Sequence, residues 1–274
     1  MYNEFEIIVV NDGSTDHTAE ILDRYKSMIR IINKPNGGTA SALNVGIDAM
    51  DKNSDWFKWL SADDLLTQNS LYFMFDEIKK LGEQNYNRIF YTNYDIINHN
   101  GDVVKEFIEP NYNNLPDFDR NVILLTNYYG NASSSLIHKS ILKQVGKFDE
   151  TVGYAEDYEF WLRACLLHGL KLHLIQIKSL QYRVHPKQLT AKKALDSFQH
   201  SLQIKNKIME QLSEFNQEKY RLGLKQYHNM PIKVRYRRKI RDTMFKIMPE
   251  GFSRKVLSVY MKRKQEKYGN EGLN

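Results

Sequence analysis

Two acidic clusters, each directly after an apolar run, have the residue types and spacing that could do chemistry. Residues 11–16 (NDGSTD) follow the apolar run 5–10, and residues 61–64 (SADD) follow the run 56–60. Apolar runs of this length predict buried strands, and acids just past a strand lie at the carboxyl edge of a sheet, where open α/β folds bind ligands. The two clusters therefore predict an enzyme that handles a nucleotide and a metal ion.

In the first cluster the residue of interest is Asp12. A carboxylate at a strand end can accept a hydrogen bond from the imide N–H of a pyrimidine, which few other base edges offer. Gly13 permits a sharp turn, and Ser14, Thr15 or Asp16 can cap the following helix. A strand, turn and capped helix without any ligand would also explain the segment, so both interpretations stay open.

In the second cluster Asp63 and Asp64 would repel each other unless a cation lies between them and a phosphate. Hard oxygen ligands suit Mg²⁺ or Mn²⁺ bridging a diphosphate, with the metal acting as a Lewis acid on the leaving group. The alternative is again a helix cap, because the pair precedes Leu65 and Leu66.

A further pair of acids, Glu156 and Asp157, stands at the start of a predicted helix over residues 156–168. The helix macrodipole favours acids there, and a general base would need a carboxylate facing an acceptor hydroxyl, so a structural and a catalytic role both stay open. Beyond this helix, Arg183 and His185 alternate onto one face of a predicted strand, where both could meet a diphosphate or its metal. A structural role for the histidine is the alternative.

These side chains need a scaffold, and residues 5 to about 94 alternate between strand and helix patterns. The predicted strands are 5–10, 29–33, 56–60 and 88–93, and the predicted helices are 15–27, 39–49 and 69–81. Such alternation predicts right-handed βαβ units, that is, an α/β fold with a mostly parallel sheet and helices on both faces. This Rossmann-like half, about residues 1–95, should bind the nucleotide.

The pattern changes in about residues 96–190, the half that should carry the acceptor. It predicts a hairpin that turns at Asn100 and Gly101, a Ser-rich strand around residues 131–138, and short strands near residues 171–183.

Residues 191–274 are predicted to be a helical, basic extension of a catalytic domain that covers residues 1–190. The chain has a net charge of +6, and basic residues outnumber acidic ones strongly after residue 219. Segments 234–248 and 252–260 mix Arg and Lys with apolar residues at roughly helical spacing, which suits peripheral contact with an anionic membrane. Helices packed on the catalytic domain are the alternative. Nucleic acid is not an expected partner, because no recognised module accompanies the charge.

Composition bears on the size of the fold and on the compartment. The 274 residues, 42% of them hydrophobic, suffice for one large α/β domain with appended helices. Cys165 is the single cysteine, and its apolar neighbours predict a buried thiol in a reducing compartment. No run approaches the roughly 18 apolar residues that span a bilayer, and no signal pattern stands at the N-terminus. We therefore expect a cytoplasmic protein, with the basic tail able to hold it at the inner face of the cell membrane.

The order of the motifs is more specific than any one of them. Residues 5–16 (FEIIVVNDGSTD), then 37–47 (GGTASALNVGI), then 60–64 (LSADD), then 148–158 (FDETVGYAEDY), then 182–185 (YRVH) closely resemble family 2 glycosyltransferases with the GT-A fold. The resemblance covers about residues 5 to 190.

This resemblance implies an inverting transfer of a sugar, of hexosyltransferase type, from a nucleotide-diphosphate sugar with UDP as the expected nucleotide. The acceptor would be a hydroxyl of a glycan or of a lipid-linked molecule in bacterial surface polysaccharide synthesis, and Mg²⁺ or Mn²⁺ the expected cofactor. Asp157 would be the general base with Glu156 supporting it, Asp12 would hold the base of the nucleotide, and Asp63 the metal and diphosphate. The full donor-contacting set implied is Asp12, Asn44, Ser61, Arg183 and His185, and the metal set is Asp63, Asp64 and His185.

The chain departs from the family pattern in two places. Members usually carry Asp-x-Asp-Asp where residues 61–64 read SADD, so a hydroxyl at Ser61 replaces the carboxylate expected on the ribose. Members also begin with an extra strand and helix before the region that starts here at Phe5, so we expect this first unit to be lacking. Loss of that strand would leave strand edges unpaired and apolar surface exposed, which predicts that the isolated protein is poorly soluble.

Two other functions stay open at this point. The departures favour a catalytically degenerate protein that binds a sugar nucleotide or acts as a scaffold. A nucleotidyltransferase on a related fold is disfavoured, because no Gly-rich, Lys-containing phosphate loop stands near the N-terminus.

Overall fold

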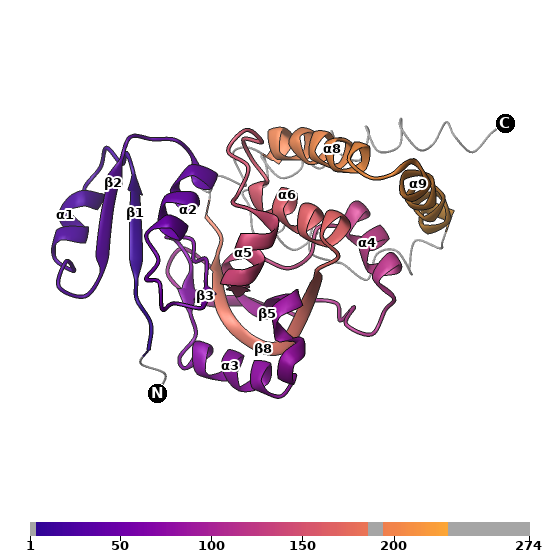
Figure 1. Cartoon of the computed structure of the whole chain (residues 1–274). Helices are drawn as coiled ribbons and strands as arrows, with labels where there is room; N and C mark the ends of the chain where they lie inside the picture. Colours follow the sequence, from indigo (N-terminus) through magenta and orange to yellow (C-terminus); the bar gives the residue numbers. More distant parts are fainter. Residues whose placement is uncertain (1–3, 186–193, 230–274) are drawn as a thin grey trace.

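The computed structural model of the chain describes residues 4–185 and 194–229, and Figure 1 shows how their elements are arranged. The strands are β1 (Ile8–Asp12), β2 (Arg30–Lys34), β3 (Trp56–Phe57), β4 (Leu65–Leu66), β5 (Arg88–Ile97), β6 (Val103–Phe107), β7 (Ile137–His138) and β8 (Lys171–Arg183). The α-helices are α1 (Thr18–Asp23), α2 (Thr39–Asp48), α3 (Ser70–Lys79), α4 (Asp117–Thr126), α5 (Lys139–Val145), α6 (Glu156–Leu162), α8 (Ala194–Glu210) and α9 (Glu214–Asn229).

The central sheet has the strand order β4-β8-β5-β6. Its long pairing, β5 with β8, is parallel, whereas the shorter β4 and β6 pair antiparallel with β8 and β5. In Figure 1, α3 lies below this sheet, and α5, α6 and α4 lie above it. The α/β class of the GT-A fold and the helices on both faces are confirmed, and both long pairings are parallel.

The sheet is divided rather than continuous, because β1 pairs with β2 and β3 pairs with β7 in two further two-stranded sheets. The predicted strand over 56–60 is reduced to β3, since only Trp56 and Phe57 find partners on β7. By contrast, the short strands predicted over 171–183 are one strand, because β8 follows β5 along its whole length across two register shifts.

The Ser-rich segment is where local chemistry overrides the strand prediction. Ser134 Oγ donates to the carbonyl of Asn131 (2.8 Å), and Ser135 Oγ donates to that of Ala132 (2.7 Å). Hydroxyls that bond to their own backbone compete with a sheet ladder. Residues 132–134 therefore form a 3₁₀ turn, η2 (Ala132–Ser134), and only β7 remains as a strand.

The main core lies between the central sheet and the helices above it. Phe160, Trp161 and Leu162 of α6 are fully buried, and Ile204 and Ile208 of α8 belong to the same apolar cluster. Helix α6 continues into one π-helical turn over Arg163–Leu167, so the predicted helix over 156–168 is present with altered geometry. Helix α8 packs on α6, and α9 packs on α4. The segments 234–248 and 252–260 lie outside the described residues.

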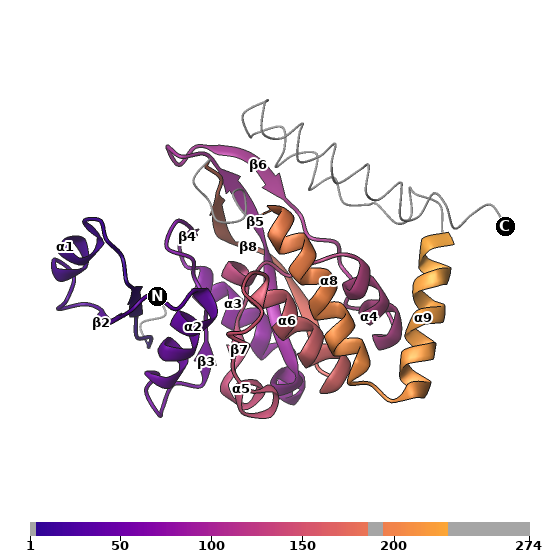
Figure 2. The ribbon, with the colours of Figure 1, turned by 90° about the horizontal axis from the view of Figure 1, so that it is seen from above.

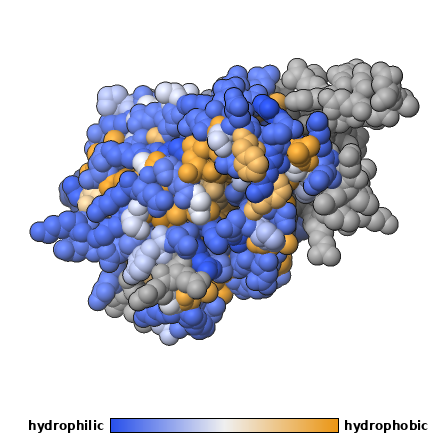
Figure 3. Space-filling view, turned by 45° about the vertical axis from the view of Figure 1, so that its right-hand side comes forward, coloured by the Kyte–Doolittle hydropathy of each residue, from blue (hydrophilic) through white to orange (hydrophobic). Residues whose placement is uncertain are grey.

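The unit β1-α1-β2 stands apart from this core, next to α2 (Figure 2). Helix α1 buries no residue, and Phe5, Ile7, Ile21, Tyr25 and Met28 are all exposed. The face of the molecule in Figure 3 is mainly hydrophilic, with apolar side chains in small groups among polar ones.

Candidate active site

Asp12 ends β1 and ties it to the loop that leads into α2. Its carboxylate accepts hydrogen bonds from Lys34 Nζ (2.5 Å) and from the backbone N–H groups of Gly37 (2.9 Å) and Gly38 (2.8 Å). Partial burial opposes ionisation, but the bonds from Lys34 and the two glycines hold the pKa of Asp12 below its ordinary value. Gly13 is required beside it, because its φ is +74° and a Cβ atom there would lie 2.7 Å from the backbone nitrogen of Asn36.

The SADD segment meets Arg183, at the end of β8, and His185, two residues beyond it. Arg183 Nε donates to the carbonyl of Asp63 (2.8 Å), and its backbone N–H donates to Asp64 Oδ1 (2.9 Å). His185 Nε2 lies 3.2 Å from Asp63 Oδ2. Residues about 120 positions apart in the sequence thus form one cluster of two acids, a guanidinium and an imidazole at the edge of the central sheet.

The predicted ribose residue, Ser61, touches the acceptor half of the molecule. Ser133 Oγ, from the 3₁₀ turn, donates to Ser61 Oγ (2.9 Å), and the backbone N–H of Ser61 points at the same hydroxyl (3.3 Å). Lys58 Nζ donates to the carbonyls of Ser133 (2.7 Å) and Ser135 (3.3 Å), which fixes this turn against the SADD segment.

Burial shifts the pKa values of two residues in and beside this cluster. It raises the pKa of Asp64 to about 6, with the neighbouring charge of Asp63 acting in the same direction. It lowers the pKa of Lys58 to about 7, against the attraction of Asp64. Asp64 Oδ2 is buried, and within residues 4–185 and 194–229 it has no hydrogen-bond partner. A carboxylate oxygen left in that state is costly unless a cation or a ligand donor meets it.

For a divalent cation, the residues offer a small ligand set. Among the described residues no group of three or more His, Cys, Asp or Glu side chains is gathered as a complete metal shell. Asp63 and His185 form a pair, and Mg²⁺ is commonly held by one or two carboxylates together with water and substrate phosphates. The side chains therefore fit a metal that is shared with a diphosphate, and the predicted metal roles of Asp63, Asp64 and His185 stay predictions.

The acid pair of α6 occupies a strained helix start. Ala155, the residue before it, has a left-handed backbone (φ +75°), which L residues other than Asn and Asp rarely adopt and which occurs where the surroundings enforce it. Asp157 Oδ2 accepts a 2.6 Å hydrogen bond from the hydroxyl of Tyr128, and its Oδ1 accepts from the N–H of Tyr158 (2.7 Å). Asp157 is therefore oriented by a partner from outside its own helix.

The two acids also perturb each other. Burial and the adjacent Asp157 raise the pKa of Glu156, and burial raises the pKa of Asp157 against the hydrogen bonds from Tyr128 and Tyr158. A raised pKa in a carboxyl pair favours the state with one proton on the pair.

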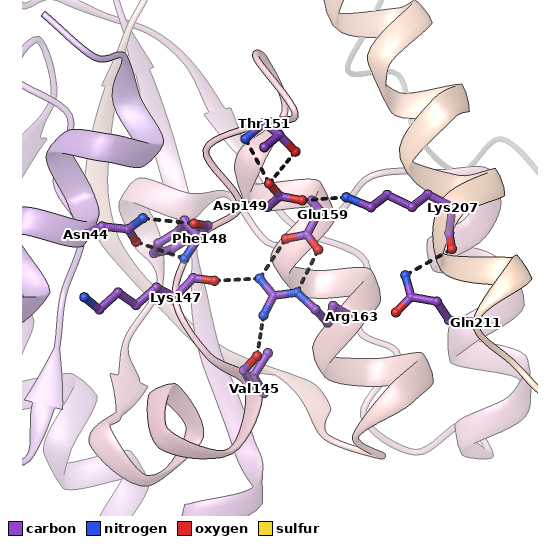
Figure 4. A network of polar contacts seen from close by, with 10 residues as sticks. All are labelled: Asn44, Val145, Lys147, Phe148, Asp149, Thr151, Glu159, Arg163, Lys207 and Gln211. Carbon is purple, nitrogen blue, oxygen red and sulfur yellow. Dashed lines mark hydrogen bonds and ion pairs between the residues drawn. The ribbon is translucent and has the colours of Figure 1, made fainter.

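Asn44, predicted among the donor contacts, is engaged elsewhere in the structure. Its amide exchanges hydrogen bonds with the backbone of Phe148, donating to the carbonyl (2.9 Å) and accepting from the N–H (3.0 Å), and it also donates to Glu150 (2.8 Å). Figure 4 shows Asn44 joining α2 to the loop that precedes α6. A donor-contacting role for Asn44 and for Asp12 stays a prediction, as does a single cavity shared by Asp12, Asp63 and Asp157.

Sequence reasoning missed three residues of this region: Lys58, Tyr128 and Ser133. A signal existed for Lys58, because it is the one charged residue in the apolar run 56–60. No local signal marked Tyr128 or Ser133, since their partners lie 29 and 72 residues away along the chain.

Comparison with known proteins finds glycosyltransferases both among family models and among individual relatives. The family model described as glycosyl transferase family 2 matches residues 1–146. An uncharacterized glycosyltransferase of Rickettsia typhi is 34% identical over 191 residues, which cover 69% of this chain and 58% of that protein. A poly-beta-1,6-N-acetyl-D-glucosamine synthase of Staphylococcus aureus is 38% identical over 87 residues, 30% of this chain and 21% of the synthase.

Among solved structures, S. aureus TarS (residues 1–349) in complex with UDP matches with a TM-score of 0.55 at 16% identity, covering 91% of this chain and 73% of that one. This likeness concerns the fold. The chain spans 58% of the Rickettsia typhi protein and 30% of the relative from Rickettsia felis. Within the described residues, none of the helices is both long and apolar enough to cross a membrane.

Proposed function

Because this chain belongs to glycosyltransferase family 2, we propose that it transfers a sugar, with inversion, from a nucleotide-diphosphate sugar to a hydroxyl group of a glycan or lipid-linked acceptor. UDP is the proposed nucleotide. The observation that carries the proposal is the cluster of Asp63, Arg183 and His185, because it joins an acid after a strand to a cation and an imidazole able to meet a diphosphate.

On the donor side, Asp63 and His185 would hold Mg²⁺ or Mn²⁺, which when bound supplies Lewis-acid stabilisation of the departing diphosphate. Arg183 already donates to the carbonyl of Asp63 and to that of Asn98 (2.9 Å), so it braces the segment that carries the acids. Ser61, whose hydroxyl accepts a hydrogen bond from Ser133, would meet the nucleotide in place of the usual carboxylate.

On the acceptor side, Asp157 would take the proton of the attacking hydroxyl. Tyr128 fixes one carboxylate oxygen through its 2.6 Å hydrogen bond, which sets the direction of the carboxylate. Glu156 is buried, and the negative charge of Asp157 favours its protonated form, so one charge is left on the pair. A base with a raised pKa is better matched to proton transfer near neutral pH than an ordinary aspartate.

The test is turnover of a panel of nucleotide sugars with Mn²⁺, by the wild type and by Asp157→Asn. Loss of the base should lower kcat by about 10³-fold with little change in donor KM. Asp119→Asn, an exposed acid in the first turn of α4, is the matched control and should leave kcat unchanged. If the wild type turns over no donor, the proposed activity is wrong. If both variants behave alike, the role of Asp157 as the general base is wrong.

A second function is sugar-nucleotide binding without turnover. It is favoured by Ser61 in place of a carboxylate and by Asp12, whose oxygens already accept from Lys34, Gly37 and Gly38. In the same panel it predicts nucleotide binding by calorimetry with no released nucleotide from any donor.

We also propose a role in bacterial surface polysaccharide synthesis, at the cytoplasmic face of the membrane. Support comes from the likeness to poly-beta-1,6-N-acetyl-D-glucosamine synthase and from the basic sequence of residues 230–274. Sedimentation of the full chain with anionic vesicles, but not with neutral ones, would support the membrane contact, and its absence from both would exclude it.

A further inference from the structure

Helix α8 contacts both chain segments that lead to the hydrogen bond between Tyr128 and Asp157. Lys205 Nζ donates to the carbonyl of Leu125 (3.0 Å) in the last turn of α4, three residues before Tyr128. Lys207 Nζ donates to Asp149 Oδ2 (2.8 Å), in the loop that leads to Asp157. Helix α8 therefore hydrogen-bonds to the segment before Tyr128 and to the segment before Asp157.

The loop between α5 and α6, residues 146–155, is held from three sides (Figure 4). Asn44 of α2 binds the backbone of Phe148. Arg163 of the π-helical turn donates to the carbonyls of Val145 and Lys147 while its Nε and Nη2 pair with Glu159. The third contact is the ion pair between Asp149 and Lys207 of α8. Asp149 also accepts two hydrogen bonds from Thr151, so its carboxylate links α8 to the backbone of the loop.

Nearer to the acids, the loop packs against a histidine of α8. The ring of His200 lies so close to Gly153 that a Cβ atom added at Gly153 would be 3.1 Å from the histidine Cε1. The ring centroids of His200 and Tyr154 are 5.8 Å apart. The next residue is Ala155, with its left-handed backbone. A conformation that L residues rarely adopt persists where neighbouring structure enforces it, and His200 of α8 packs against the two residues before Ala155.

We propose that α8 is a positioning element for the general base, with Lys207 as the positioning residue that acts through Asp149 and the 146–155 loop. The inference rests on the proposed function, and it concerns residues beyond the part of the chain matched by the family model. Ile204 and Ile208 dock the helix in the core, so the ion pair at its surface is not needed for α8 to fold against α6. We expect loss of the ion pair between Lys207 and Asp149 to change the geometry of Asp157 and not the affinity for the donor.

The experiment compares Lys207→Met, Lys207→Arg and Asp149→Asn in the full chain with the wild type. Lys207→Met and Asp149→Asn should each lower kcat about ten-fold, because a small displacement of a positioned group can cost up to about 100-fold. Donor KM should stay within about two-fold, and Lys207→Arg should recover kcat, since it restores the ion pair. Lys26→Met, which breaks the exposed pair with Asp23 in the N-terminal unit, is the matched control and should change neither constant.

A merely structural role would give another pattern. If Lys207→Met lowers the melting temperature but leaves kcat unchanged, or if kcat falls and Lys207→Arg does not restore it, the positioning role is wrong. Hydrogen exchange separates this result from failure of the proposed activity: Lys207→Met should raise amide exchange in residues 149–158 even if no donor is turned over. Unchanged exchange there would overturn the inference on its own.

Discussion

The β1-α1-β2 unit and the α6 region each carry a motif acid, yet they hold it by different means. Helix α1 buries none of its residues, whereas α6 buries every residue except Asp157. Asp12 is held by backbone N–H groups and a lysine within 26 residues of sequence. Asp157 lies on α6, a helix packed into the main core, and its carboxylate accepts a hydrogen bond from Tyr128. The two acids are held across similar distances in sequence, 22 to 26 residues for Asp12 and 29 for Asp157. The regions therefore differ in burial: the unit of Asp12 contributes no buried helix residue, whereas the helix of Asp157 belongs to the main core.

The largest expected difference between the two regions is in stability. Trp161→Ala should lower the free energy of unfolding by about 3–5 kcal/mol, because a fully buried ring is lost together with its hydrogen bond to Gly130 (3.0 Å). Ile21→Ala in α1, where the side chain is half exposed, should change it by less than about 0.5 kcal/mol. Urea unfolding of the two variants measures both values, and similar losses would contradict the comparison.

The two regions should also respond to pH in opposite directions. In α6 the folded-state pKa of Glu156 is raised, to about 7 from 4.5, so its contribution to stability is present below pH 4.5 and is lost as the pH rises to 7. Glu156→Gln, which cannot ionise, should remove this loss of stability.

In the N-terminal unit the pKa of Asp12 is lowered, so its contribution is present above the ordinary pKa of aspartate and is lost as the pH falls below that value. Unfolding curves of the wild type, Glu156→Gln and Asp12→Asn between pH 3 and 8 test both signs. A Glu156→Gln variant that keeps the wild-type slope between pH 4.5 and 7 would show that this carboxyl is not responsible.

A smaller effect should separate the structural from the proposed ligand role of Asp12. Asp12→Asn weakens the bonds to Lys34, Gly37 and Gly38 and should cost about 1 kcal/mol of stability. If the carboxylate also holds the nucleotide base, donor affinity should fall about ten-fold, the loss of one charge-assisted bond. Lys34→Met is the matched control, because it breaks the same ion pair but keeps the carboxylate, and calorimetry with UDP compares the two. Equal affinity in both variants would leave Asp12 with the structural role alone.

The smallest effect concerns the exposed apolar surface of the N-terminal unit. Met28→Lys replaces a side chain that is two-thirds exposed, so stability should change by less than about 0.5 kcal/mol while solubility rises. The concentration at which each protein begins to aggregate, measured by light scattering, checks this. A large loss of stability would contradict the exposure of Met28.

Several elements in both halves of the fold follow from local pattern. The helix expected over 39–49 is α2 (Thr39–Asp48), the strand expected over 29–33 is β2, and the Asn100-Gly101 hairpin joins β5 to β6. The buried thiol of Cys165 is confirmed as well, with its pKa raised by burial to about 12. In these cases apolar periodicity and turn residues act over a few positions, so the chain carries the information locally.

The sequence by itself determined which residues are candidates for chemistry: the acids after two predicted strands, the acid pair opening α6, and Arg183 with His185. Only the tertiary structure decided their partners. It brought Ser133 into hydrogen bonds with Lys58 and Ser61, and Tyr128 into a hydrogen bond with Asp157. It also packed α8 against the loop before α6. Turns and amphipathic faces are set by neighbours along the chain, whereas hydrogen bonds between residues 29 to 75 positions apart form only when packing of the core brings their elements together.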